Sequence, residues 1–368
     1  MKILILNRHN SDAVNGLKKI ILSFIDLCRD SEKSTFYYGM QSNGPLTGSL
    51  KNPDRIIPFN IDRNISILSD IYNIIRLIIV GYKYKINIVH AHAAKPGMIA
   101  RVASLFAPFK VIYTPNNWYF EGQSNLKKQI FLFLEQLLSY IPNQTIVAVT
   151  DSEEKMIYSK INKKVNVKVI ADGIDFSTIK PSTKKDNDFY ALENVKKHKK
   201  IIGSIIRLDK QKNPLEILQY ANYLKNKNIY FVIIGDGELI EECKNYMIKN
   251  NLDNILLTGF KDNYSAFFDL FDYTLFTSNN EGLPLIMIES VFNDIKIITK
   301  NFRGALDFVT KDIGKILDAD SVEKRAFQLY DYIKNDINSV QIDKNIFMNK
   351  FSRETMINKY ISLYNDTI

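Results

Sequence analysis

The chain of 368 residues has very little cysteine: Cys28 and Cys243 lie far apart and do not have the spacing of a metal site. This excludes a disulfide framework and a structural zinc site, and it fits a reducing cytosol. The N-terminal segment MKILILNRHN has an apolar core too short for a signal peptide and lacks a small-residue cleavage site. No run of about 18 apolar residues occurs. We therefore expect a cytoplasmic protein with no membrane-spanning segment.

The charge is unevenly distributed. Residues 1–185 carry 25 Lys and Arg against 14 Asp and Glu, whereas residues 186–368 carry 24 against 26. A basic N-terminal half is compatible with nucleic acid, anionic lipid or a phosphorylated substrate, and equally with ordinary surface lysine. No helix-turn-helix, zinc module or aromatic–basic RNA motif is present, so nucleic acid is not an expected partner. A non-enzymatic binder of nucleic acid or anionic surfaces remains as a remote alternative.

Short apolar runs alternate with helical patterns along most of the chain. Expected strands are 2–7, 87–92, 111–115, 145–150, 200–206, 230–235, 254–259, 273–277 and 296–299. Expected helices are 14–29, 95–106, 125–140, 214–225, 238–249, 263–270, 283–292 and 352–364, with a further helix beginning at Asp151. This alternation predicts parallel strands joined by crossover helices, in an α/β protein with two doubly wound domains.

The periodicity fails between residues 171 and 200, which are rich in Gly, Pro, Ser, Thr and charge and are typical of a linker. We expect an N-terminal domain at 1–175, a C-terminal domain at 176–350, and a last helix at 351–368 that packs back toward the N-terminal domain. Ligands of such domains bind at the carboxyl ends of the strands, here facing an interdomain cleft.

Two cations follow the strand at 200–206, in the segment GSIIRLDKQKNP. Arg207 comes directly after the strand, and Lys212 stands where the next helix begins. A helix start is electrostatically unfavourable for a lysine, so an anionic ligand is the better explanation of Lys212. A diphosphate suits both groups, because arginine can bind it as a fork.

Two glutamates stand in the segment EGLPLIMIES. Glu281 lies in the loop after the strand at 273–277, and Glu289 lies two turns into an otherwise apolar helix. Gly282 permits close backbone approach, and the free N–H groups at this helix start could receive a hydroxyl or a phosphate. A buried ion pair is the ordinary explanation of a residue such as Glu289, and acceptance of ligand hydroxyls is the other.

Two further patterns are weaker. Gly235 and Gly237 follow the strand at 230–235 and suit either a tight turn or a fragment of a dinucleotide-binding loop. His90 and His92 alternate on one strand, which favours a role in the core or a pocket wall over a metal site, since the chain has only four histidines.

Taken in order, the motifs GSIIRLDKQK, FVIIGDGE, ILLTGF and NNEGLPLIMIES resemble the nucleotide-binding half of the family 4, or group 1, glycosyltransferases, which have the GT-B fold. The resemblance covers residues 200–300 strongly and the first half more loosely. It implies that Arg207, Lys212 and Glu281 are the catalytic residues: the two cations hold the donor diphosphate and the glutamate contacts the donor sugar. Positions implied to bind the rest of the donor are Glu289 at the ribose, Gly259, Phe260 and Lys261 beside the base, and Gly282 and Leu283 through their backbone.

The first half also resembles this family. Gly16 occupies the place of the glycine-rich loop that approaches the donor phosphate, and HAHAAKPGMIARVA makes His92 and Lys95 acceptor-side candidates. Asn116 stands where family members commonly have a donor-contacting histidine. Asparagine can donate and accept hydrogen bonds but cannot become positively charged by protonation. We therefore expect this replacement to affect the choice of donor and the pocket geometry more than the presence of activity.

The implied reaction is transfer of a sugar from a nucleotide diphosphate donor, UDP by family frequency, with retention of configuration, to a glycan or lipid-linked acceptor in surface polysaccharide synthesis. No cofactor and no metal are expected, because two fixed cations can stabilise the leaving diphosphate. A nucleotide-sugar epimerase of the same fold is the alternative. The Lys-bearing apolar stretches at 65–85 and 126–141, together with Lys110, are expected either to pack on the sheet or to rest on an anionic inner leaflet.

Overall fold

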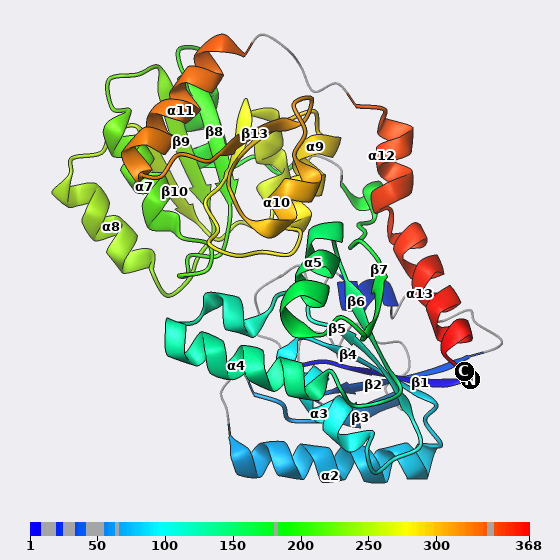
Figure 1. Cartoon of the computed structure of the whole chain (residues 1–368). Helices are drawn as coiled ribbons and strands as arrows, with labels where there is room; N and C mark the ends of the chain where they lie inside the picture. Colours follow the sequence, from blue (N-terminus) through cyan, green and yellow to red (C-terminus); the bar gives the residue numbers. More distant parts are fainter. Residues whose placement is uncertain (9–19, 25–33, 42–54, 63–65, 180–182, 337–341) are drawn as a thin grey trace. The chain divides into compact units, whose positions relative to one another are not determined.

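The computed structural model describes residues 1–8, 20–24, 34–41, 55–62, 66–179, 183–336 and 342–368 (Figure 1). The chain forms two compact units. Unit 1 comprises Met1–Ile174 together with Lys350–Ile368, and unit 2 comprises Asp175–Asn349. Each unit is built around one parallel sheet.

Unit 1 contains a seven-stranded sheet in the order β3-β2-β1-β4-β5-β6-β7, in which every pairing is parallel. The strands are β1 (Lys2–Leu6), β2 (Thr35–Met40), β3 (Ile56–Pro58), β4 (Ile88–His92), β5 (Lys110–Thr114), β6 (Gln144–Ala148) and β7 (Asn166–Val169). The central strands are buried on both faces, which explains why they appear in the sequence as nearly continuous apolar runs.

Helices cover the sheet of unit 1. They are α2 (Ile67–Tyr84), α3 (Ala94–Ala103), α4 (Asn125–Leu138), α5 (Asp151–Met156) and α13 (Arg353–Thr367), with a 3₁₀ turn at Tyr119–Gly122 and a π turn at Ile157–Ile161. The start of α5 is capped by Thr150, whose hydroxyl oxygen accepts a hydrogen bond from the backbone N–H of Glu153 at 3.2 Å. The last helix, α13, belongs to this unit, where the Tyr364 hydroxyl lies 2.6 Å from Nδ1 of His90.

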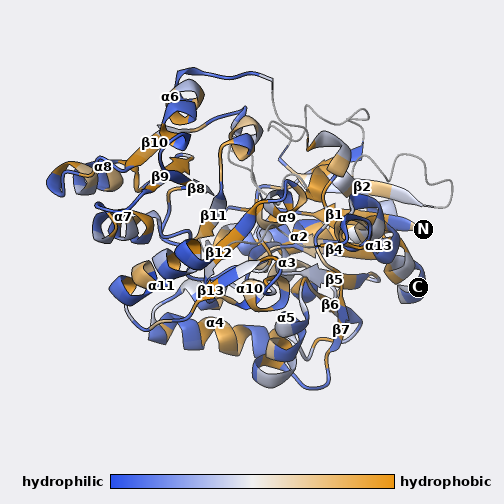
Figure 2. Ribbon diagram, turned by 90° about the horizontal axis from the view of Figure 1, so that it is seen from above, coloured by the Kyte–Doolittle hydropathy of each residue, from blue (hydrophilic) through white to orange (hydrophobic). Residues whose placement is uncertain are grey.

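Unit 2 contains a six-stranded parallel sheet in the order β10-β9-β8-β11-β12-β13. The strands are β8 (Lys200–Ile205), β9 (Ile229–Ile234), β10 (Ile255–Gly259), β11 (Tyr273–Phe276), β12 (Lys296–Lys300) and β13 (Gly314–Leu317). The helices are α6 (Asn187–Lys196), α7 (Pro214–Tyr223), α8 (Ile240–Lys249), α9 (Leu285–Phe292), α10 (Arg303–Phe308), α11 (Val322–Asn335) and most of α12 (Lys344–Phe351), with 3₁₀ turns at Phe176–Thr178 and Tyr264–Asp269. One apolar cluster lies where α7, α8 and α11 pack on the sheet, and a second lies beneath α6 and the 3₁₀ turn 264–269. The strands are accordingly among the most apolar ribbon segments in Figure 2.

Each sheet has one switch point, the place where successive connections leave neighbouring strands in opposite directions. In unit 2 the chain runs from β8 outward through β9 and β10, then returns beside β8 to form β11 and runs the other way through β12 and β13. The loops after β8 and β11 therefore diverge at the carboxyl edge, which is where doubly wound sheets bind ligands. In unit 1 the same situation arises between β1 and β4.

The predicted fold class, two doubly wound α/β domains, is confirmed. The reading of 171–200 as a linker is wrong at its end, because residues 187–196 form α6. This helix is capped by the Asp186 side chain, which accepts from the Phe189 N–H at 3.0 Å, and it buries Phe189 and Leu192. The helix expected at 263–270 is a 3₁₀ helix, and most of the helix expected at 14–29 lies outside the described residues.

Candidate functional site

The loop after β8 is shaped by Asp209, which the sequence analysis did not single out. Its carboxylate contacts Nε of Arg207 and accepts a hydrogen bond from the backbone N–H of Lys212 at 2.9 Å. The Arg207 side chain is partly exposed, and Nη1 and Nη2 form no hydrogen bond with the part of the chain that the structure describes. One face of this guanidinium is therefore available for a ligand.

The loop after β11 is joined to the loop after β8 by hydrogen bonds. The Thr277 hydroxyl donates to the carbonyl oxygens of Lys212 and Asn213, each at 3.0 Å. The backbone N–H of Asn279 donates to the carbonyl of Gln211 at 2.9 Å. Both loops at the switch point thus form one connected structure, which fixes the backbone that carries the lysine.

Lys212 and Glu281 meet at this junction. The Lys212 ammonium contacts the Glu281 carboxylate, and the Ser278 hydroxyl donates to the same carboxylate oxygen at 3.1 Å. Both charged side chains are largely buried. A cation and a carboxylate at the carboxyl edge of the sheet can bind the negative and the hydroxyl-bearing parts of one ligand, with each group keeping the other satisfied until that ligand arrives.

Glu216, on the first turn of α7, supports the junction from behind. Its buried carboxylate accepts hydrogen bonds from Asn213 at 2.8 Å, from the Tyr220 hydroxyl at 2.7 Å and from Lys300 at 3.0 Å, and it forms an ion pair with Arg325 at 2.6 Å. Burial alone would raise the pKa of Glu216, but the hydrogen bonds from Tyr220, Lys300 and Arg325 outweigh it and lower the pKa. Glu216 is therefore an ionised anchor, and it holds the residue that follows Lys212.

The segment Gly282–Leu283 packs against the start of α10. A Cβ atom placed on Gly304 would lie 1.3 Å from the carbonyl oxygen of Gly282, so no larger residue fits at position 304. The backbone N–H of Gly304 also points to the carbonyl of Glu281 at 3.4 Å. The backbone that carries Glu281 is thus fixed from two sides.

Glu289 is buried in α9, where the Tyr264 hydroxyl donates to its carboxylate at 2.9 Å. Nearby in sequence, Gly259 ends β10 with a positive φ of +74°, a conformation that favours glycine, and Phe260 is exposed. An exposed aromatic beside a turn of this kind can stack on a planar group.

Lys261 is held within the protein. Its ammonium lies 2.6 Å from both Asp186 and Asp188, at the start of α6. These two aspartates form an Asp-x-Asp triplet, and in the structure the lysine occupies the position between them. Among the described residues, no group of three or more His, Cys, Asp or Glu side chains is arranged to hold a metal ion.

Gly235 and Gly237 have a packing role. A Cβ on Gly235 would lie 1.8 Å from the carbonyl oxygen of Ile206, and one on Gly237 would lie 2.4 Å from that of Leu208. The turn after β9 therefore lies directly against the backbone that leads from Arg207 to Lys212. Of the two readings left open by the sequence, the structure supports the tight turn.

In unit 1, His90 and His92 are fully buried at the carboxyl end of β4. Nε2 of His90 lies 2.9 Å from the Thr114 hydroxyl, and its Nδ1 is satisfied by α13. Burial lowers the pKa of His92 to about 3, and neither of its ring nitrogens has a hydrogen-bond partner among the residues that the structure describes. Both rings are neutral, as a core or pocket-wall position requires.

The remaining predicted positions have different environments. Lys95 lies near the start of α3 and pairs with Asp70 of α2 at 2.8 Å, with both side chains mostly buried. Asn116 follows β5 with a φ of +58°, and its side-chain oxygen and nitrogen are buried and form no hydrogen bond with any described residue. Gly16 lies outside the described residues.

The structure therefore brings together Arg207, Lys212, Glu281 and the backbone of 282–283, all within unit 2. Sequence reasoning missed Asp209, Ser278 and Glu216. The first two could have been suspected, since each is a polar residue within three positions of a predicted ligand-binding residue. Nothing in the sequence distinguishes Glu216 from an ordinary acidic residue in a first helical turn.

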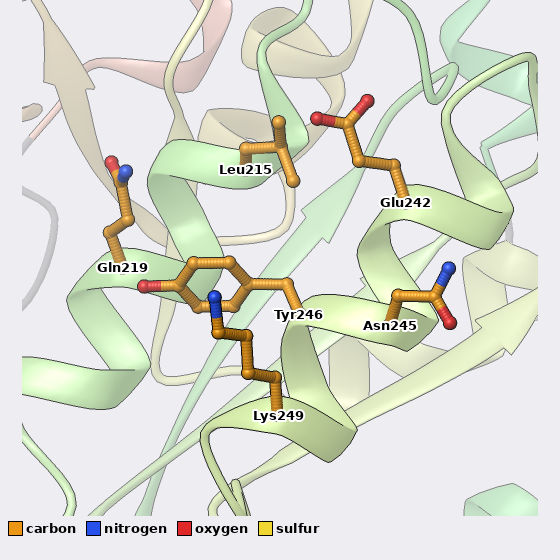
Figure 3. Close-up of a pocket in the computed structure, with 6 residues that line it drawn as sticks. All are labelled: Leu215, Gln219, Glu242, Asn245, Tyr246 and Lys249. Carbon is orange, nitrogen blue, oxygen red and sulfur yellow. The ribbon is translucent and has the colours of Figure 1, made fainter.

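Away from this edge, a hollow of about 390 Å³ lies between α7 and α8 (Figure 3). Its lining consists of Leu215, Gln219, Glu242, Asn245, Tyr246 and Lys249. These side chains come from the helical layer and not from strand ends, and the hollow lacks the converging polar groups of a binding site.

Comparison with known proteins agrees with this geometry. Residues 186–347 match the family model described as glycosyl transferases group 1. The chain is 26% identical, over 96% of its length and 95% of the relative, to UDP-Gal:alpha-D-GlcNAc-diphosphoundecaprenol alpha-1,3-galactosyltransferase of Escherichia coli. It is 25% identical, over 84% of each chain, to the capsular polysaccharide biosynthesis glycosyltransferase CapM of Staphylococcus aureus.

Solved structures support the fold. Anabaena Alr3699/HepE, determined in complex with UDP and glucose, superposes over the full length of both chains with a TM-score of 0.80 at 16% identity. Because the sequence identity is low, this similarity shows only that the two chains share a fold. Taken with the family model over residues 186–347 and the full-length relative, it shows that the chain has the GT-B fold and is similar to the group 1 glycosyltransferases.

Proposed function

We propose that this glycosyltransferase moves a sugar from a UDP-sugar, with retention of configuration and without a metal ion, to a hydroxyl of a lipid-linked or glycan acceptor in cell-surface polysaccharide synthesis. The observation that carries the proposal is the junction of Lys212 and Glu281 at the switch point of unit 2, with Arg207 beside it. The names of two relatives support the acceptor class, since both include an undecaprenol diphosphate. A solved neighbour that holds UDP supports the donor class.

The proposed roles follow from charge. The available face of Arg207 and the ammonium of Lys212 bind the donor diphosphate, and Glu281 accepts hydrogen bonds from hydroxyls of the transferred sugar. Glu289 accepts from the ribose, Phe260 and the backbone at Gly259 and Lys261 flank the base, and the backbone at Gly282 and Leu283 contacts sugar and phosphate. For unit 1, the proposal keeps the roles that the sequence suggests: Asn116 contacts the donor, and His92 and Lys95 contact the acceptor. The neutral ring of His92 and the paired ammonium of Lys95 suit positioning better than proton transfer.

In the proposed reaction, the bond from the anomeric carbon to the diphosphate oxygen breaks and a bond to the acceptor oxygen forms on the same face of the sugar. The acceptor proton passes to the leaving phosphate, so no protein base is needed. The rate is raised chiefly because Arg207 and Lys212 stabilise the charge that develops on the diphosphate. Two fixed cations can do this without Mg²⁺, and the Asp-x-Asp triplet at 186–188 is already occupied by Lys261.

An epimerase of the same fold would bind the same donor, but the curated relatives are named as transferases. An assay without an acceptor distinguishes the two reactions. With donor alone, a transferase hydrolyses the sugar nucleotide slowly, whereas an epimerase releases an epimerised sugar nucleotide. A lipid-linked acceptor also implies that the enzyme works at the inner surface of the cytoplasmic membrane.

The test is Lys212→Ala, compared with Lys210→Ala as a matched control two residues earlier on the exposed part of the same loop. A panel of UDP- and GDP-sugars is first screened by thermal shift, and transfer is then measured with an undecaprenyl-diphosphate sugar in the presence and absence of EDTA. We expect Lys212→Ala to lower kcat by about 10²–10³-fold, the range for loss of one charge-stabilising group. The control should stay near wild type, and EDTA should have no effect.

The anomeric configuration of the product, read by NMR, tests retention separately. Near wild-type transfer by Lys212→Ala would overturn the assignment of the diphosphate site. Dependence on an added divalent cation after EDTA would overturn metal independence alone.

A further inference from the structure

We propose that the outward faces of α2 and α4, with the corner at Leu105 and Phe106, form a docking surface for an anionic lipid bilayer. This inference deepens the proposed function, because it rests on the acceptor being carried in a membrane and assigns the residues that would bring the enzyme there. We call these residues the α2/α4 surface: Leu68, Ile71, Tyr72, Ile75, Ile79 and Tyr82 of α2, the corner 105–106, and Leu126, Ile130, Phe133, Leu134, Leu137 and Tyr140 of α4 and its C-terminal end.

The sheet topology places these helices side by side. From β3 onward the strand order of unit 1 advances in one direction through β4, β5 and β6, and the connecting helices are α2, α3 and α4. Because crossovers between parallel strands are right-handed, the three helices lie on the same face of the sheet. α3 packs against both of its neighbours, as Figure 1 shows. At one end, the Tyr82 hydroxyl donates to the carbonyl of Phe106 at 3.1 Å and so joins α2 to the corner.

α2 is apolar on the side that faces away from the sheet. Its buried side carries Leu77 and Val80, but also the polar residues Asp70 and Asn73. The opposite side presents Leu68, Ile71, Tyr72, Ile75, Ile79 and Tyr82, at the 3–4 residue spacing of one helical stripe. Leu68 is 83% exposed. A helix that is apolar on both sides is normally covered on both, and no described residue covers this one.

α4 repeats the arrangement. Its buried residue is Glu135, whereas Leu126, Ile130, Phe133, Leu134 and Leu137 form an exposed stripe. Leu126 is 72% exposed and Phe133 is 62% exposed. The α4 ribbon in Figure 2 carries apolar colouring along its length. Contiguous exposed apolar area of this kind marks an interaction surface.

The charges of the two helices indicate the partner. Each helix contains one carboxylate, and each is turned inward and paired: Asp70 with Lys95 at 2.8 Å and Glu135 with Arg101 at 2.8 Å. The exposed charges on the outward sides are those of Lys83, Lys127 and Lys128. Apolar stripes edged by basic residues complement an anionic bilayer surface, into which aliphatic and aromatic side chains insert while lysines remain at the headgroups.

Two further facts fit a surface attachment. No described helix is long and apolar enough to cross a membrane, so contact would be interfacial. Tyr72, Tyr82 and Tyr140 lie among the aliphatic residues, and tyrosine favours the interface between lipid and water. Lys110, which the sequence also suggested for this role, is not part of the surface, because its ammonium is bound to the carbonyl of Thr367 at 2.5 Å.

The experiment uses the full chain in flotation with vesicles of pure phosphatidylcholine and of phosphatidylcholine with 30% phosphatidylglycerol. Two apolar variants, Ile75→Glu/Ile79→Glu and Phe133→Glu/Leu137→Glu, are compared with Ile248→Glu/Ile346→Glu, which changes two somewhat more exposed residues of unit 2. Folding of each variant is checked by circular dichroism and thermal unfolding.

A second pair of double variants tests how much the lysine charges contribute to vesicle binding. Lys127→Gln/Lys128→Gln is compared with Lys249→Gln/Lys311→Gln, which removes two exposed lysines from unit 2. We expect wild type to float with the anionic vesicles and much less with the neutral ones. Each lysine close to an anionic surface contributes about five-fold in affinity, so the α4 pair should lose roughly 25-fold and the control pair little.

The outcomes separate this inference from the proposed function. Both apolar variants should lose vesicle binding and yet transfer sugar to a water-soluble short-chain acceptor at the wild-type rate. If the proposed function itself is wrong, wild type will also fail to transfer sugar to this acceptor. Equal vesicle binding by wild type and both apolar variants overturns the inference. The inference is also overturned if wild type does not bind lipid but forms a concentration-dependent dimer in sedimentation experiments, and the same variants abolish that dimer. A second copy of the chain would then cover the α2/α4 surface.

Discussion

Glu216 provides the sharpest test of how the proposed donor site is held together. Its buried carboxylate contacts Lys300 and Arg325 and accepts from Asn213 and Tyr220. Glu216→Gln keeps the shape but leaves two cations facing an amide. Removing one partner of a buried ion pair costs about 3–5 kcal/mol. For a unit of about this size each kcal/mol lowers Tm by roughly 2–4 °C, so we expect a fall of about 6–20 °C.

The assay is urea and thermal unfolding followed by circular dichroism, with Glu242→Gln as the control. Glu242 is exposed on α8, so the control should change the free energy of unfolding by less than about 0.5 kcal/mol. Because the pKa of Glu216 is lowered in the folded protein, its ionisation stabilises the fold above the ordinary value of 4.5 and this contribution is lost as the pH falls through the lowered pKa. The difference between wild type and variant should therefore narrow below about pH 4.5. A loss below about 1 kcal/mol at pH 7, or a difference that widens in acid, would refute the assignment of Glu216 as an ionised anchor.

Three other substitutions test separate parts of the molecule. Gly304→Ala should destabilise unit 2 by more than about 2 kcal/mol and weaken donor binding, because its Cβ would collide with the carbonyl of Gly282; unchanged unfolding and donor affinity would contradict the packing. Tyr264→Phe removes the 2.9 Å hydrogen bond to Glu289 and should weaken nucleotide binding, measured by calorimetry, by about 3- to 10-fold, while an unchanged affinity would remove this carboxylate from the site. Burial raises the pKa of Asp172 to about 7, so the folded state loses stability as pH rises from about 4 to 7, and Asp172→Asn should be more stable than wild type above pH 7 with an advantage that shrinks in acid.

The sequence was most informative about the carboxyl edge of unit 2. The strand ends at 205 and 276 fall within a residue or so of their predicted positions, so the side chains that follow them had to share one edge. The contacts within that edge were not predictable. The ion pair between Lys212 and Glu281 spans 69 positions and depends on β8 and β11 being neighbours, which requires the order of the whole sheet.

Short elements were lost for a different reason. β13 has four residues and lies at the sheet edge, where half-buried Lys315 breaks the apolar run. α6 has a weak apolar pattern, with Phe189 and Leu192 as its buried residues, so its many charges made it look like a linker. In both cases the neighbouring strands supply the stability that the segment's own sequence does not reveal.

The helices α2 and α4 show what periodicity can and cannot decide. Apolar residues occur all around α2, so the pattern fits packing on the sheet as well as contact with a membrane. The structure assigns Leu77 and Val80 to the first role and leaves Ile75 and Ile79 facing outward. The same helix buries its one carboxylate, Asp70, in an ion pair with Lys95 of α3, which no amphipathic pattern would suggest. A helix that buries its acid and exposes its isoleucines is poorly suited to water alone, and the Ile75→Glu/Ile79→Glu variant should therefore lose its membrane partner without losing its fold.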